Sequence, residues 1–339
     1  MRVTPIFEEQ SVGAPVIVKY GSLAQIAQEQ RNFEAIFPFV KSHKLTVLEA
    51  TALGRHLGAV AYSLVGASDD RIRSFGAFYS SAGIRDIETA LRSLFQETCV
   101  LWYASDNRCQ PQESTLSELY EGYLNFDHRK ISVAFQLKYP DKPVVFPTID
   151  FPGVARRFRH PIAAYCDMKM RMTRTTWQCR THGDLHGGNV LVDDSTCDTW
   201  LIDFGRTGVG HWARDFAALE AAIRFQHAPA NDLVSLFEFE DAVMSIERLG
   251  EKVPFHRADQ PELTKAAEAV SIIRGLAAEM CDVDDDKATA IDYFGSLFYH
   301  TINYMRFHAL IKNPIRRSHV LLSAALVYES LRRLGGVEP

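Results

Sequence analysis

The chain has 339 residues, enough for one large domain or two smaller ones. Apolar residues make up 47% and charged residues 23%, values typical of a globular protein with a sizeable core. The formal net charge of −5 does not favour a nucleic-acid-binding protein, which usually carries a basic surface, so we expect no nucleic-acid partner.

The sequence also lacks the usual signals for secretion or membrane insertion. No uninterrupted apolar run approaches the ~20 residues of a membrane-spanning helix. Residues 1–9 contain no apolar segment of the kind found in a signal peptide. The six cysteines form no Cys-x-x-Cys pair and lie at positions 99, 109, 166, 179, 197 and 281. We therefore expect a cytoplasmic protein with reduced thiols and no membrane association.

Residues 1–66 predict a small mixed lobe of strands around one helix. The expected strands are Arg2–Glu8, Pro15–Tyr20, Leu45–Ala52 and Ala59–Val65. The expected helix, Leu23–Phe37, carries Ile26, Phe33, Ile36 and Phe37 on one apolar face. Gly66 follows the last strand, and we predict a hinge there.

Residues 67–339 predict a larger, mainly helical part. Helices are expected at Ile84–Tyr103, Ser114–Gln136 and His319–Leu334, the last ended by Gly335-Gly336. Residues 140–161 contain several prolines and predict loop and short strands. We therefore expect an α+β fold whose domain boundary divides residues 1–66 from 67–339.

Two motifs lie near the middle of this larger part. Residues 182–189 read His-Gly-Asp-Leu-His-Gly-Gly-Asn, and residues 199–205 read Thr-Trp-Leu-Ile-Asp-Phe-Gly. The first fits the catalytic loop of kinases, His-x-Asp-x-x-x-x-Asn, at His182, Asp184 and Asn189. Between the motifs, two apolar runs flank a turn at residues 193–196 and predict a β-hairpin that ends on Asp203.

These residue types suit phosphoryl transfer, which depends on positioning and on neutralising charge. Asp184 is the candidate catalytic carboxylate beside an acceptor hydroxyl. Asn189 and Asp203 offer the hard oxygen ligands that Mg²⁺ prefers. Lys19, at the end of the run Ala14–Val18, is the candidate cation for the phosphates of ATP, like the strand lysine of kinases.

The first motif also matches parts of the metal sites of two other protein classes. Gly183-Asp-Leu-His-Gly187 resembles the first motif of calcineurin-type phosphoesterases, but their Gly-Asp-x-x-Asp and Gly-Asn-His motifs do not occur. His182 and His186 have the four-residue spacing of zinc proteases, yet the intervening and following glycines disfavour the required helix.

These motifs resemble the aminoglycoside phosphotransferase and choline kinase-like family, a branch of the protein-kinase-like fold. The segment Gly208–Glu220 resembles the stretch that follows the metal-binding tripeptide in this family, where an aspartate opens a helix. Asp215 matches that aspartate and predicts an N-cap for a helix at Phe216–Phe225. The segments Leu201–Gly205, Gly210-His211 and Arg214–Glu220 are also similar to the kinase-like ternary complex associated domain 9 of bacterial conflict systems.

The resemblance implies a two-lobed fold with a small, truncated N-lobe (residues 1–66) and a large, mainly helical C-lobe (residues 67–339). It also implies that Lys19 pairs with a helix glutamate. Glu29 precedes the apolar face of the first helix and is preferred, with Glu34 as the alternative. His182 and Asp215 would support the catalytic loop structurally.

The implied activity is an ATP- and Mg²⁺-dependent phosphotransferase acting on a hydroxyl, with a small-molecule acceptor. The chain contains no Gly-x-Gly-x-x-Gly sequence, so we expect ATP to bind weakly and mainly through Lys19 and the metal ligands. The alternative is a catalytically impaired kinase-like module that interacts with protein partners in a multi-component bacterial defence system.

Two charged runs remain open to more than one interpretation. The basic run Arg156, Arg157, Arg159 and His160 could bind an anionic substrate or partner, or form a solvated face. The acidic run at residues 282–286 could receive a cationic substrate, as in aminoglycoside kinases, or form an inter-helix loop.

Overall fold

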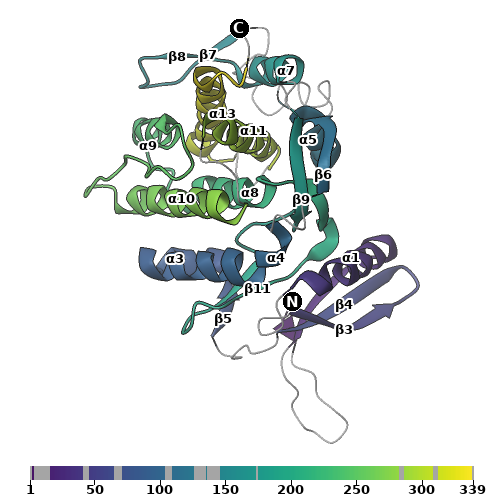
Figure 1. Cartoon of the computed structure of the whole chain (residues 1–339). Coiled ribbons are helices and arrows are strands. Elements are labelled where there is room, and N and C mark those ends of the chain that lie inside the picture. Colours follow the sequence, from purple (N-terminus) through teal and green to yellow (C-terminus); the bar gives the residue numbers. More distant parts are fainter. Residues whose placement is uncertain are drawn as a thin grey trace, which may run out of the picture. The chain divides into compact units, whose positions relative to one another are not determined.

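The structure is a computed structural model with a mixed α/β fold (Figure 1). It describes residues 2–3, 16–40, 46–64, 71–103, 109–125, 135, 146–172, 175–281, 286–307 and 312–337. The chain forms two compact units that alternate along the sequence. The first comprises Met1–Arg108 and Cys179–Asp215, and the second comprises Cys109–Gln178 and Phe216–Pro339. Gly66 lies outside the described residues, and the predicted boundary there stays a prediction.

The first unit contains a four-stranded antiparallel sheet in the order β1-β2-β4-β3. The strands are β1 (Arg2–Val3), β2 (Val16–Ser22), β3 (Thr46–Leu53) and β4 (Leu57–Leu64). The predicted strands from Pro15 onward are confirmed to within two residues at each end. For the predicted strand Arg2–Glu8, only Arg2 and Val3 are among the described residues.

Helix α1 (Leu23–Ile36) follows β2 directly and lies along the sheet (Figure 1). Ser22 and Gln25 form a capping box at its start, which satisfies backbone N–H groups that the first turn cannot pair. Ile26, Phe33 and Ile36 are buried as predicted. Phe37 was expected on the same face but is 40% exposed, because the α-helix ends before it and a 3-10 turn, Phe37–Phe39, begins.

The predicted β-hairpin is confirmed. Strands β10 (Val190–Asp193) and β11 (Thr199–Leu201) pair antiparallel, with Leu191 opposite Trp200. A third strand, β5 (Ile72–Ser74), pairs with β10 on its other edge and leads into α2 (Phe75–Ser81). All residues of β10 and β11 are buried, so the hairpin is a rigid support for the residues at its open end.

The prediction of one continuous helix at residues 84–103 is wrong. The structure has α3 (Ile84–Arg92), a π-helical turn (Ser93–Thr98) and α4 (Val100–Tyr103). Within the π turn, the Ser93 and Thr98 hydroxyls lie 3.3 and 3.2 Å from the Thr199 hydroxyl, and Thr98 also donates to the Thr199 carbonyl. The wider turn lets two hydroxyls five residues apart reach one residue of β11.

The second unit is mainly helical. Its elements include β6 (Cys109–Thr115), α5 (Leu116–Leu124), β7 (Thr148–Asp150), β8 (Arg157–Arg159), α7 (Pro161–Arg171), α9 (Leu233–Ser245), α10 (Pro261–Met280), α11 (Lys287–Tyr304) and α13 (Pro314–Leu334). Two further elements, β9 (Thr175–Thr181) and α8 (Arg214–Ala222), each contribute residues to both units, and β12 (Gly208–His211) belongs to the first.

Two helix predictions in this unit need correction. The helix expected at 114–136 begins at Leu116 and ends at Leu124, because Asn125 adopts a left-handed conformation with φ 52°. The last helix ends before Gly335 as predicted, but it begins at Pro314, where Asn313 caps the first turn. Of the loop-and-strand prediction for residues 140–161, β7 and β8 are confirmed, and residues 140–145 lie outside the described residues.

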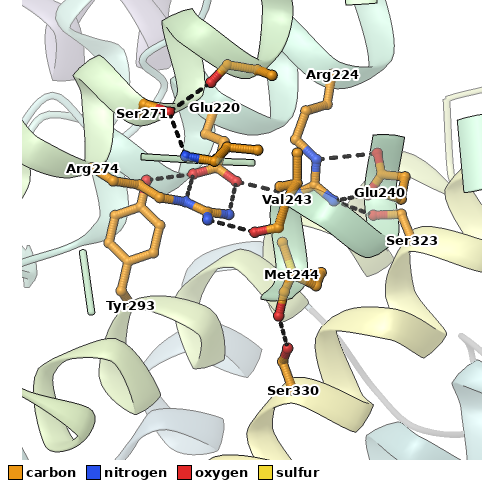
Figure 2. Close-up of polar contacts among 12 residues, drawn as sticks. Glu220, Arg224, Glu240, Val243, Met244, Ser271, Arg274, Tyr293, Ser323 and Ser330 are labelled. Carbon is orange, nitrogen blue, oxygen red and sulfur yellow. Dashed lines mark hydrogen bonds and ion pairs between the residues drawn. The ribbon is translucent and has the colours of Figure 1, made fainter. Parts of the chain in front are cut away.

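Helices α11 and α13 pack together, and a fully buried ionic network lies close by (Figure 2). The carboxylate of Glu220 accepts from Arg274 Nη2 at 2.7 Å, from Tyr293 Oη at 2.8 Å and from Arg224 Nη1 at 3.2 Å. Arg224 also pairs with Glu240. The side chains of both glutamates and both arginines are 0% exposed, so the two acids neutralise the two bases without solvent.

Among the described residues, no helix is both long enough and apolar enough to cross a membrane.

Candidate functional site

The loop at residues 182–189 connects β9 to β10 and contains no helix. The zinc-protease arrangement of His182 and His186, which needs one helical turn, is therefore absent. Gly183 has φ +79°, and a Cβ atom there would lie 2.2 Å from the carbonyl oxygen of Arg206. Glycine is required at this position both for its backbone conformation and for the close approach of the segment that follows Asp203.

Asp215 anchors the start of this loop. Its carboxylate accepts hydrogen bonds from the backbone N–H groups of His182 at 2.7 Å and Gly183 at 3.0 Å, and from the Tyr103 hydroxyl at 2.9 Å. Asp215 is completely buried. The predicted N-cap role is wrong, because α8 begins at Arg214 and places Asp215 within its first turn. The side chain holds the loop instead of capping its own helix.

His182 links the loop to the end of the hairpin. Its Nε2 atom lies 3.0 Å from the Ile202 carbonyl oxygen, and its own carbonyl accepts from the Thr207 hydroxyl at 3.2 Å. The imidazole is fully buried and packs against the ring of Phe204 at 5.6 Å between centroids. These contacts fix the backbone on both sides of Asp203.

The hairpin register brings Asn189 and Asp203 to the same end of the strand pair. Val190 lies opposite Leu201, and one step further the Ile202 N–H donates to the Asn189 carbonyl at 3.1 Å. The Asn189 side chain donates through Nδ2 to the Asp184 carbonyl at 2.9 Å. This hydrogen bond uses the nitrogen of the amide and leaves its oxygen as the atom that can meet a cation.

Lys19, Glu29 and Asp203 converge within the first unit. Lys19 Nζ lies 2.5 Å from Asp203 Oδ1 and also pairs with Glu29 Oε2. Glu29 is fully buried, whereas the Lys19 and Asp203 side chains are 31% and 35% exposed. A Cβ atom on Gly205 would approach Glu29 Oε2 to 3.0 Å and Lys19 Nζ to 3.4 Å, so a glycine suits the space beside the ion pairs.

The structure shows which of the two candidate glutamates pairs with Lys19. Glu34 lies at the exposed surface of α1, where it accepts from the Gln30 side chain at 2.9 Å. Glu29 is the glutamate that reaches Lys19. The catalytic and cofactor-binding roles assigned to these residues remain predictions.

Two further residues complete this cluster and were not identified from the sequence. The Tyr62 hydroxyl donates to Glu29 Oε1, which also accepts the Phe204 N–H at 2.7 Å. The Asn32 amide donates to the carbonyl oxygens of Phe204 at 2.9 Å and Gly205 at 3.0 Å. Strand alternation places Tyr62 on the same face as Val60, and Asn32 lies three residues after Glu29 on α1, so periodicity could have indicated both.

The electrostatics favour a charged Lys19. Burial alone would lower the pKa of the Lys19 ammonium, but the hydrogen bonds and charges of Asp203 and Glu29 outweigh it and raise the pKa above its ordinary value. Burial, together with the neighbouring Glu29, raises the pKa of Tyr62. Tyr62 therefore remains a neutral hydrogen-bond donor to Glu29 at physiological pH.

The donor set for a metal is small and rich in oxygen. In the part of the chain that the structure describes, no group of three or more His, Cys, Asp or Glu side chains is arranged to hold a metal ion. A carboxylate from Asp203 and an amide oxygen from Asn189 would be two protein ligands. That number fits Mg²⁺, which keeps several waters and is often bound through one or two carboxylates together with the phosphates of a nucleotide.

The basic run noted in the sequence is largely neutralised within the second unit. Arg156 pairs with Asp241 at 3.1 Å and with Glu329, Arg157 with Asp150 at 3.0 Å, and Arg159 with Asp167 at 2.9 Å. Of the acidic run, only Asp286 is described, and it caps α11. Residues 282–285 lie outside the described residues.

Comparison with known families supports one of the resemblances. Residues 153–306 match the model of a family described as ternary complex associated domain 9. The matched range contains the loop at 182–189, Asp203 and Asp215, but neither Lys19 nor Glu29. The predicted similarity to this domain is thus confirmed over that range. No curated protein matches the chain.

Proposed function

We propose that the chain is an ATP- and Mg²⁺-dependent phosphotransferase that acts on a hydroxyl group of a small-molecule acceptor. The observation that carries the proposal is the convergence of Lys19, Glu29 and Asp203, with Asp203 at the same hairpin end as Asn189. Kinases use such a lysine, glutamate and aspartate together to hold ATP and its metal.

Each residue has a distinct role in this proposal. Asp203 and Asn189 would hold the metal through oxygen atoms, and the bound Mg²⁺ would neutralise charge on the phosphates. Lys19 would bind a phosphate oxygen. The buried Glu29 keeps the Lys19 ammonium in place, because it is held in turn by Tyr62 and by the Phe204 N–H.

Asp184 would orient the acceptor hydroxyl and take its proton. The hydrogen bond from Asn189 to the Asp184 carbonyl fixes the backbone at this position, and the Asp184 side chain is partly exposed. A carboxylate in this setting can approach a substrate without leaving the loop.

A second function is favoured by the family match. The description of ternary complex associated domain 9 points to a part of a multi-protein assembly. The alternative is therefore a kinase-like module that binds nucleotide weakly or not at all and interacts with protein partners of a bacterial defence system.

Phosphate release from ATP, with and without candidate hydroxyl acceptors, tests the proposal. Asp184→Asn keeps the size of the side chain and removes its charge. We expect it to lower turnover by about 10²–10⁴-fold while Mg²⁺·ATP still raises the thermal midpoint. Equal turnover in both proteins would contradict the role of Asp184. No turnover and no thermal shift in the unmodified chain would favour the interaction module.

A further inference from the structure

The backbone of Asp203 is held in an unusual conformation. Its φ of 70° and ψ of 68° lie in the left-handed region, which residues other than glycine rarely adopt. Asp tolerates this region better than most residues, but the conformation still needs support from its surroundings. The direction of the Asp203 carboxylate depends on that support.

Two side chains from one turn of α1 hold the peptide groups that follow Asp203. Glu29 and Asn32 are three residues apart and therefore share a helix face. Glu29 accepts the Phe204 N–H, while the Asn32 amide donates to the Phe204 and Gly205 carbonyls. An acceptor and a donor on one helix thus fix both polar groups of Phe204.

Asn32 is itself oriented. The Gln28 side chain donates to Asn32 Oδ1 at 2.6 Å, which turns the Asn32 nitrogen toward the two carbonyl oxygens. Within the part of the chain that the structure describes, Asn32 makes no hydrogen bond to Lys19 or Asp203. Its effect on either residue would therefore pass through the Phe204–Gly205 backbone.

We propose that Asn32 is a positioning residue that fixes the direction of the Asp203 carboxylate toward Lys19 and toward a bound cation. The effect on nucleotide binding rests on the function proposed above. The effect on Lys19 does not, because it concerns only the ion pair between Lys19 and Asp203. The two effects can be measured separately.

The first measurement is the reactivity of Lys19. Asn32→Leu removes the donor, keeps a similar volume and changes no charge. Lys19 Nζ is held between Glu29 and Asp203, and these ion pairs restrict the access of a reagent to it. Once Asp203 is released, we expect trace acylation of Lys19, measured by peptide mass spectrometry at one fixed pH, to become about three- to tenfold faster. The exposed Lys252 serves as the internal reference.

Gln30→Leu is the matched control. The Gln30 side chain donates to Glu34, four positions on, just as Gln28 donates to Asn32, but this bond lies at the exposed surface of α1. It should leave Lys19 acylation unchanged. If Asn32→Leu does not fold, Gln28→Leu replaces it. Gln28 is exposed, and besides orienting Asn32 it accepts, among the described residues, only from the exposed Arg31, so we expect a smaller change in the same direction.

The second measurement is Mg²⁺·ATP affinity by calorimetry, where we expect Asn32→Leu to weaken binding by about tenfold. Unchanged Lys19 acylation in a folded Asn32→Leu protein overturns the proposal. Faster Lys19 acylation in Asn32→Leu supports the positioning role whether or not the unmodified chain binds Mg²⁺·ATP. A lack of Mg²⁺·ATP binding by the unmodified chain would count against the proposed function alone.

Discussion

The buried carboxylate of Asp215 accepts three hydrogen bonds, and its removal would leave three donors without it. An unpaired buried donor costs ~1–3 kcal/mol. We therefore expect Asp215→Ala to lower the free energy of unfolding by ~2–4 kcal/mol, as measured by urea denaturation.

Asp232→Ala provides the comparison for this prediction. Asp232 is an exposed N-cap of α9 that accepts the Ser235 N–H at 2.7 Å, so its replacement should cost ~1 kcal/mol. Equal losses in the two variants would show that Asp215 does not anchor the loop.

Individual site residues differed in how far the sequence could predict them. Asp184, Asn189 and Asp203 lie in short motifs whose spacing implies a loop and a hairpin, and the structure contains both. Asp215 was recognised as a structural residue, but its predicted contact was wrong. A helix cap is a local pattern, whereas the donors that Asp215 binds lie 32 or more positions away in the sequence. Asn32 and Tyr62 carry no motif, and their contacts depend on how α1 packs.

At the scale of elements, the loop at 182–189 depends on Gly183. A side chain there would meet the Arg206 carbonyl at 2.2 Å and would also require a positive φ. We expect Gly183→Ala to lower the free energy of unfolding by ~2–4 kcal/mol. Gly208→Ala should change it by less than ~0.5 kcal/mol, because a Cβ atom there would meet nothing within 4 Å.

Thermal or urea unfolding of the two glycine variants measures this difference. A Gly183→Ala protein as stable as Gly208→Ala would show that the loop has another conformation in solution.

Among the elements, those with local patterns were predicted best. The strands of residues 15–65 and the hairpin follow alternating or short apolar runs between turn residues, and these signals are local. The π turn at Ser93–Thr98 depends on hydroxyl contacts with Thr199, about one hundred residues away. The early end of α5 depends on a left-handed Asn125, a conformation that the apolar periodicity does not reveal.

At the scale of the whole molecule, the ionic network of the second unit predicts how stability depends on pH. Glu240 accepts from His319 Nε2 at 2.7 Å, and Arg316 Nη1 lies 2.9 Å from His319 Nδ1. Burial lowers the pKa of His319 despite the attraction of Glu240. Burial opposes the charged form of Glu240, but Arg224 and His319 outweigh it and lower its pKa to about 2.

Both shifts act in the same direction. The unfolded chain binds a proton on His319 below about pH 6.5 and on Glu240 below about pH 4.3, whereas the folded chain binds these protons only at lower pH. We therefore expect the free energy of unfolding to be highest above pH 7 and to fall as the pH drops toward 4.

His319→Gln should flatten this dependence between pH 7 and 5. Glutamine can replace both hydrogen bonds but does not titrate. His256→Gln is the control, because His256 is exposed. Urea denaturation at several pH values gives the slopes, and a slope in His319→Gln equal to that of the unmodified chain would contradict the role of His319.

The central claim is that Lys19, Glu29 and Asp203 form a site for the phosphates and metal of a nucleotide. Isothermal titration calorimetry of ATP into the full chain, with and without Mg²⁺, tests it most directly when repeated on Asp203→Ala. We expect binding that requires Mg²⁺ in the unmodified chain and that is lost in Asp203→Ala, because a charged ligand disappears where few others exist. Equal Mg²⁺·ATP affinity in the two proteins, or no Mg²⁺-dependent binding in the unmodified chain, would contradict the claim.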